Sequence, residues 1–321
     1  MTPSSEPQAS PFQHVLAPLD GSSIAETALN AVSLLIDSLG VSVTLVHIIE
    51  RDAPEAIHGE RHLRTTQEAQ AYLTELSRRA LPAGSRVRQH VHTAPVSDVA
   101  RGIVEHAQEL GADLIVLCTH GRGGFRHRIF GSVAQQVIAL GETPVLLVPP
   151  PRAKGARSLE LRRLLVPLDG NETHESGLTA ARALARATGA SLHLLAVIPT
   201  LRHVAGPEAA TGLLLPRATT AVLDLAEQRL EAYLQRHLTA LETEGLTATA
   251  EVRRGAPALT IVRAADARNV DLITLATHGH AGMEAFWLGS VAPRVSARSR
   301  CPLLLVSSPP EARMSNSATD G

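Results

Sequence analysis

A chain of 321 residues, 44% apolar and 19% charged, is long enough for two globular domains with apolar cores. A net charge of −1 excludes a basic field that would hold nucleic acid, and 2% aromatic residues exclude platforms for stacking single-stranded bases. Two cysteines exclude a disulfide framework and favour a reducing compartment, and no apolar run approaches the ~18 residues that span a bilayer. Because the N-terminus does not read as a signal peptide, we expect a cytoplasmic protein without nucleic-acid or membrane partners.

The chain repeats itself. The motif VLAPLDG at residues 15–21 returns as LLVPLDG at 164–170, an offset of 149 residues. A longer match aligns residues 113–148 with 271–306 at an offset of 158, without gaps, and 18 of these 36 positions are identical. Two ordered matches of this kind indicate two copies of one structural unit.

Short β-branched and Leu-rich runs alternate with helical patterns in both copies. Between the first two runs, Ser23 and Glu26 form a capping-box pattern, followed by apolar residues at helical spacing that end at Gly40. The corresponding helical pattern of the second copy ends at Gly189. Strands are predicted at residues 14–19, 41–49, 86–94, 113–119 and 144–149, and at 164–168, 191–198, 247–254, 271–277 and 302–307.

Strand and helix alternation is typical of βαβ units with right-handed crossovers, and near-continuous apolar strands are typical of parallel sheets. The predicted fold class is therefore α/β, with two tandem, doubly wound domains that each contain a five-stranded parallel sheet. The predicted domains are residues 12–150 and 162–308, joined by a linker at 151–161. The polar ends, 1–11 and 309–321, are predicted to be disordered.

The last strand of each copy is apolar and lies at a sheet edge. An apolar edge strand invites pairing, and two copies in one chain can pair their edges with each other. We therefore expect an intramolecular pseudo-dimer, while a homodimer of the whole chain stays open. Leu146 and Leu304 lie on these strands, and strand alternation leaves open whether Leu146 faces the partner domain or its own core.

Open α/β sheets bind ligands at the carboxyl ends of their strands, where the strand order reverses. The first and fourth strands of each copy are expected to flank that point. The first strand is followed by Asp20 in one copy and by Asp169 in the other, each with a Gly after it. Such an Asp can accept hydrogen bonds from an exocyclic amine or a ribose hydroxyl, or it can simply shape an Asp-Gly turn.

The fourth strand is followed by a loop of nine residues between two glycines, and the second glycine leads into a helix through Ser. Glycine lets main-chain N–H groups approach an anion, and a helix N-terminus presents further N–H groups, so this pattern favours a phosphate chain. The alternative is a turning loop with Ser as the helix cap. The residues concerned are Gly121, Gly131 and Ser132 in the first copy and Gly279, Gly289 and Ser290 in the second.

The motifs PLDGS, THGRGG, GSV and TPVLLV resemble those of the UspA-type universal stress proteins, nearly end to end in both copies. The resemblance implies an adenine nucleotide alpha hydrolase-like fold, pairing through the last strand, and a stress-response protein that binds ATP or a related adenine nucleotide, with or without Mg²⁺. It implies that the phosphates lie at the glycines and serines above. It further implies a nucleotide site that includes Asp20, Ile48, Val133, Asp169, Val197 and Val291.

The sequence departs from the family pattern of Gly, two residues, Gly, nine residues and Gly-Ser at its first position, which is Cys118 in one copy and Ala276 in the other. A Cβ there would crowd a ligand only if the main chain needed a positive φ or direct contact. Two alternatives to a signalling nucleotide binder stay open: a nucleotide-free scaffold and a slow ATPase. No Walker lysine or positioned general base is evident, so at most weak ATPase activity is expected.

Several other residues allow two interpretations. His120 and His278 either polarise a phosphate or pack within their loops. Cys118 is either a redox thiol at the mouth of the site or a small buried residue. His90 and His92 share one face of a strand at a spacing that suits a metal, but no further ligand stands out, so no metal site is expected.

Overall fold

The computed structural model describes residues 11–57, 60–119, 132–150, 160–199, 216–278 and 291–308. The two ends for which disorder is expected lie outside these ranges, apart from residue 11. None of the helices in the described part of the chain combines the length and the apolarity that crossing a bilayer requires.

All ten expected strands are confirmed. The first half contains β1 (His14–Pro18), β2 (Ser42–Glu50), β5 (Val87–Val96), β6 (Leu114–Cys118) and β7 (Val145–Val148). The second half contains β8 (Arg163–Leu168), β9 (Ser191–Pro199), β10 (Ala248–Gly255), β11 (Leu272–His278) and β12 (Leu303–Ser308). A two-residue hairpin, β3 (Ala56–Ile57) with β4 (Glu60–Arg61), was not expected, because so short a pair leaves no periodic signal.

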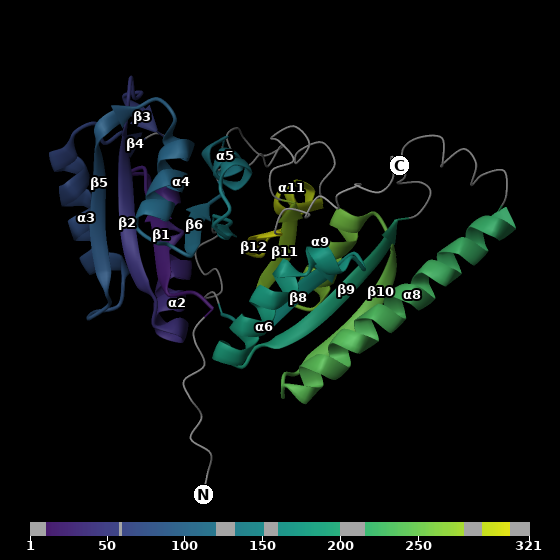
Figure 1. Ribbon diagram of the computed structural model, residues 1–321. Coiled ribbons are helices and arrows are strands. Elements are labelled where there is room, and N and C mark those ends of the chain that lie inside the picture. Colours follow the sequence, from purple (N-terminus) through teal and green to yellow (C-terminus); the bar gives the residue numbers. More distant parts are fainter. Residues whose placement is uncertain are drawn as a thin grey trace, which may run out of the picture.

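The strands of both halves form one continuous sheet in the order β10-β9-β8-β11-β12-β7-β6-β1-β2-β5 (Figure 1). Within this sheet, all strand pairs inside each half are parallel, and the strand order reverses between β1 and β6 and again between β8 and β11. The expected positions of the two reversal points are therefore confirmed. At the centre of the sheet, β12 pairs with β7 in antiparallel register. This pairing confirms the pseudo-dimer within one chain.

Helices cover both faces of the sheet because each strand alternates its side chains between two apolar clusters. One face carries α1 (Ser23–Glu26), α2 (Leu29–Leu39) and α3 (Thr66–Ala80), with α6 (Ser176–Thr188) and α8 (Pro216–Thr243) from the second half. The other face carries α4 (Val99–Glu109) and α5 (Ser132–Leu140), with α9 (Pro257–Ala267) and α11 (Val291–Ser296). Across the seam α2 contacts α6, so the first apolar cluster is shared by the two halves.

The start of the first helix corrects the expected capping box. The cap is Ser22, whose hydroxyl accepts a hydrogen bond from the N–H of Ala25 at 3.2 Å, and Glu26 forms an ion pair with Arg79. Ser23 instead donates its N–H and hydroxyl to Glu60 of β4, at 3.0 and 2.5 Å. Ser23, which the local sequence pattern predicts as the helix cap, therefore makes a tertiary contact with Glu60 instead.

Candidate functional site

The carboxyl ends of β1 and β6 mark the first candidate site, because the connections leave these strands toward opposite faces of the sheet. Asp20 follows β1 and accepts two hydrogen bonds from Ser22, from its N–H at 2.9 Å and from its hydroxyl at 2.7 Å. Between them, Gly21 has a φ of +91°, and a Cβ on it would lie 2.9 Å from Leu63 Cγ. The Asp-Gly turn therefore has a structural role, which was one of the two expected readings.

Ile48 lies on β2, level with this turn. Leu19, just after β1, donates its N–H to the carbonyl of Val46 at 2.9 Å, so the main-chain groups of Val46 face β1. Alternation along a strand turns the main-chain groups of Ile48 toward the same side, past the end of β1. The side chain of Ile48 packs elsewhere, because a Cβ on Gly102 of α4 would lie 3.1 Å from Ile48 Cδ1. Ile48 can therefore contact a ligand through its main-chain groups.

Cys118, the last residue of β6, is directed into the core. Its side chain belongs to the apolar cluster beneath α1 and α2, and its Sγ lies 3.0 Å from the hydroxyl of Thr27. Burial raises the pKa of this thiol to about 11. Of the two readings of Cys118, the structure favours the small buried residue, and its Cβ and Sγ lie beside the first helix.

The phosphate-loop residues are only partly described. Ser132 begins α5, is exposed, and is followed directly by Val133. In the second half, Val291 begins α11 and is partly buried. The remaining members of the expected site, and the imidazoles of His120 and His278, lie outside what the structure describes: Gly121, Gly131, Gly279, Gly289 and Ser290.

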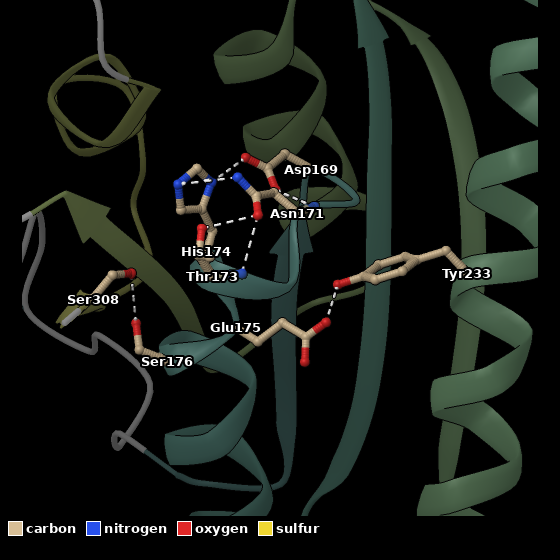
Figure 2. A network of polar contacts seen from close by, with 8 residues as sticks. All are labelled: Asp169, Asn171, Thr173, His174, Glu175, Ser176, Tyr233 and Ser308. Atoms are coloured by element: carbon tan, nitrogen blue, oxygen red, sulfur yellow. Dashed lines mark hydrogen bonds and ion pairs between the residues drawn. The ribbon is translucent and has the colours of Figure 1, made fainter. Parts of the chain in front are cut away.

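The second half differs at the residue that corresponds to Asp20. Asp169 follows β8 and accepts hydrogen bonds from the N–H of Asn171 at 2.9 Å and from Nδ1–H of His174 at 2.7 Å (Figure 2). His174 ends the short 3₁₀ helix η1 (Glu172–His174), which the side chain of Asn171 caps. The equivalent of His174 at the offset of 149 residues is Ala25. Sequence reasoning missed this imidazole, because no repeated motif contains it.

Helix α6 is held close to the second site from two directions. The carboxylate of Glu175 accepts a hydrogen bond from the Tyr233 hydroxyl at 2.7 Å (Figure 2). It accepts a second one from the His237 imidazole at 3.0 Å, and together these bonds join the start of α6 to α8. Gly177 lies so near β11 that a Cβ on it would be 2.9 Å from the N atom of Ala276. The main chain of α6 therefore packs tightly against the position where the family pattern has its first glycine.

Val197 of β9 repeats the placement of Ile48. The β8–β9 register ends with Leu168 opposite Ala196, so Val197 lies just past the last paired residue. The structure thus brings Asp20 with Ile48, and Asp169 with Val197, to the carboxyl ends of neighbouring strands. It also brings a third imidazole, His106, to His90 and His92 on β5, the edge strand that neighbours β2.

Comparison with known proteins agrees with this architecture. The universal stress protein family model matches the chain twice, at residues 11–149 and 160–307. Universal stress protein MJ0531 of Methanocaldococcus jannaschii is 29% identical over 46% of this chain and 83% of its own length. A homologue of universal stress protein A from Coxiella burnetii is 30% identical over 43% of this chain and 96% of its own length.

Among solved structures, a universal stress protein from Archaeoglobus fulgidus superposes with a TM-score of 0.64, covering 93% of this chain and 97% of that one at 17% identity. This likeness extends over both halves and so concerns the tandem fold. Together with the two family matches, it shows that the chain belongs to the universal stress protein family.

Proposed function

We propose that the first half binds ATP or a related adenine nucleotide in the crevice at the carboxyl ends of β1 and β6. Asp20 and the main chain of Ile48 contact the adenine and ribose. Gly121, Gly131, Ser132 and Val133 hold the phosphates, with Mg²⁺ as a counterion where it is bound. The observation that carries this proposal is the direction of the Ile48 main chain, which faces the space past the end of β1 beside Asp20.

The second half has the same potential site, formed by Asp169, Val197, Gly279, Gly289, Ser290 and Val291, but it binds nucleotide more weakly. His174 and Asn171 already occupy both oxygens of the Asp169 carboxylate, so a ribose hydroxyl must compete with an imidazole at 2.7 Å. This occupied carboxylate also supports the second candidate function for the C-terminal half, that of a nucleotide-free scaffold which binds a partner protein.

The proposed role of the whole protein is signalling by nucleotide-dependent conformation or partner binding in the cytoplasm, without nucleic acid and with at most weak ATPase activity. The proposed domain boundaries are 12–150 and 162–308, with 151–161 as the linker. The single charge of −1 on the whole chain supports the exclusion of nucleic acid.

Nucleotide binding is tested by calorimetric titration of the full chain with ATP, ADP and AMP, with and without Mg²⁺, and by the accompanying shift in melting temperature. Nucleotide released from the heat-denatured, purified protein is identified in parallel. We expect binding in the micromolar to millimolar range. No binding and no thermal shift with any of the three at several millimolar would contradict the proposal.

Two variants separate loss of binding from loss of stability. Asp20→Ala removes a carboxylate that accepts an N–H near a helix start, and Asp98→Ala is its matched control, because Asp98 accepts the N–H of Arg101 at 2.9 Å at the start of α4. Each is expected to cost about 1 kcal/mol of stability. Only Asp20→Ala should weaken nucleotide binding, and the pair Gly131→Val with Gly289→Val should abolish it.

A further inference from the structure

Three histidines from two elements meet on one face of the first half. His90 and His92 point from edge strand β5 toward α4, which contributes His106. His106 Nε2 lies 2.9 Å from His92 Nδ1, and the rings of His90 and His106 pack edge to face with their centroids 4.6 Å apart. His106 is 6% exposed, so the three rings pack between the strand and the helix.

The hydrogen bonds fix where the protons of His92 and His106 lie when both rings are neutral. His106 Nδ1 lies 3.0 Å from the carboxylate of Glu109 and must donate to it, because a carboxylate can only accept. Nε2 of His106 is then an acceptor, and His92 Nδ1 donates to it. Nε2 of His90 is buried and has no hydrogen-bond partner among the described residues.

The same cluster tolerates added protons poorly. The negative charge of the Glu109 carboxylate compensates one added proton on His92 or His106. A second added proton would create two positively charged imidazolium rings whose centroids lie 4.6 or 4.9 Å apart. Burial and the neighbouring His106 and His92 lower the pKa of His90.

Among the described residues of β2, β5 and α4, no buried acidic side chain offers a second countercharge. Arg88, two residues before His90 on the same face of β5, is an exposed cation. The β2 residues in register with His90 and His92 are Val46 and Ile48, which are apolar. On α4, Arg101 and Glu105 are exposed to solvent, as is Glu109 itself.

The second half has different residues at the positions that correspond to the three histidines. There Glu251 and Arg253 of β10 replace His90 and His92, and Ala264 of α9 replaces His106. Glu251 is hydrogen-bonded or ion-paired with Arg253, Arg268 and His193. The three-histidine cluster is therefore a feature of the first half alone.

In the described residues, no group of three histidine, cysteine or acidic side chains is arranged to hold a metal ion. His92 Nδ1 and His106 Nε2 are hydrogen-bonded to each other, and such a pair of imidazoles can share a proton. We propose that His90, His92 and His106 form an acid-sensitive clasp, which holds α4 on edge strand β5 near neutral pH and releases it when the cluster takes up a second proton.

The clasp predicts a local loss of protection on acidification. Because His90 has a lowered pKa in the folded state, its contribution to stability is complete above the ordinary value of 6.5 and is lost as the pH falls toward the lowered value. Hydrogen exchange of the full chain, corrected for intrinsic rates, should therefore show α4 and β5 amides opening about five- to tenfold more often at pH 5.5 than at pH 7.5. Amides of α2 and α3, on the opposite face, should change less than about twofold.

The variant His90→Gln, His106→Gln should remove this acid response, whereas His193→Gln, which changes a buried histidine of the second half, should keep it. If the double variant does not fold, the imidazole resonances of the wild type decide the matter. The clasp requires at least one ring of the cluster to titrate at a lower pH than the others, whereas three independent titrations near the ordinary value would overturn it. An acid response spread over all helices would also overturn it, as would protection of α4 by Zn²⁺ that a chelator reverses.

Discussion

Leu146 of β7 lies directly opposite Leu304 of β12 in antiparallel register, and both side chains are buried in the apolar cluster that the two halves share. This pair decides the orientation that strand alternation left open for Leu146. Its side chain faces a core, and that core includes residues of the partner half, such as Leu184 of α6. One leucine therefore contributes both to its own half and to the contact between halves.

Charged substitution of this pair should destabilise the whole chain. Leu146→Glu or Leu304→Glu places an unpaired carboxylate where the side chains are 5% and 1% exposed, and we expect a loss of about 3–5 kcal/mol in the free energy of unfolding. Denaturant titration measures it. Leu225→Glu on α8, where the leucine is 47% exposed, is the control and should change stability by less than about 0.5 kcal/mol.

An isolated first half should dimerise with itself. Without β12, strand β7 presents an unpaired edge and uncovers the apolar side chains that the second half buries. A fragment ending near residue 152 is expected to form a dimer at tens of micromolar, measured by light scattering. A fragment that stays purely monomeric would show that the halves do not depend on this edge, and the Leu146→Glu fragment tests whether any dimer uses it.

Replacing His174 should strengthen the second nucleotide site. The variant His174→Ala copies the first half, where the equivalent residue is Ala25, and releases the Asp169 oxygen that now accepts from the imidazole at 2.7 Å. One additional charge-assisted hydrogen bond to ribose corresponds to about a tenfold gain in affinity at that site. Calorimetric titration with ATP checks it, in a background of Asp20→Ala and Gly131→Val. An unchanged or weaker second site would argue for the scaffold role of this half.

Any hydrolysis of bound ATP should be slow. The described residues beside the first reversal point include the carboxylate of Asp20 and the main chain of Ile48, and the chain contains no Walker lysine. Turnover should therefore lie far below the ~10 per second that is typical of enzymes. Phosphate release under saturating ATP and Mg²⁺ measures it. A rate near the typical value that disappears in Asp20→Ala with Asp169→Ala would establish an ATPase instead.

Glu251 should make part of the stability depend on pH. Burial by itself raises the pKa of Glu251, but hydrogen bonds from His193, Arg268 and Arg253 outweigh this effect and lower the pKa to about 2. A lowered carboxyl pKa stabilises the fold above the ordinary value of 4.5, and this contribution is lost as the pH falls from 4.5 through about 2.

We therefore expect Glu251→Gln to cost about 1–3 kcal/mol at pH 7 and progressively less as the pH approaches 2. Urea titrations across this pH range measure the difference. The control is Glu172→Gln, because Glu172 is 76% exposed and pairs with Arg236 only at 3.8 Å. If the loss of stability in Glu251→Gln did not vary with pH, the charge of the Glu251 carboxylate would not contribute to the stability of the fold.

The sequence by itself determined the duplication, the ten strands and the pairing of the two halves. These features depend on local patterns: a gapless repeat of 36 positions, β-branched and Leu-rich runs, and an apolar last strand in each copy. Such patterns are readable because burial on both faces of a parallel sheet requires a continuous apolar run. The positions at which the strand order reverses were predicted from the order of these strands along the chain.

Only the tertiary structure decided which side chains meet. Glu60 replaces the expected cap partner of Ser23, Cys118 packs against Thr27, and His106 completes a cluster with His90 and His92. Each of these contacts joins residues from different elements, so its geometry depends on how those elements pack, which no local periodicity records. Asp169 and His174 are only five residues apart, yet their contact also required the structure. It depends on the 3₁₀ helix η1, which places His174 beside Asp169, whereas the equivalent residue of the first half, Ala25, lies in α1 and carries no ring.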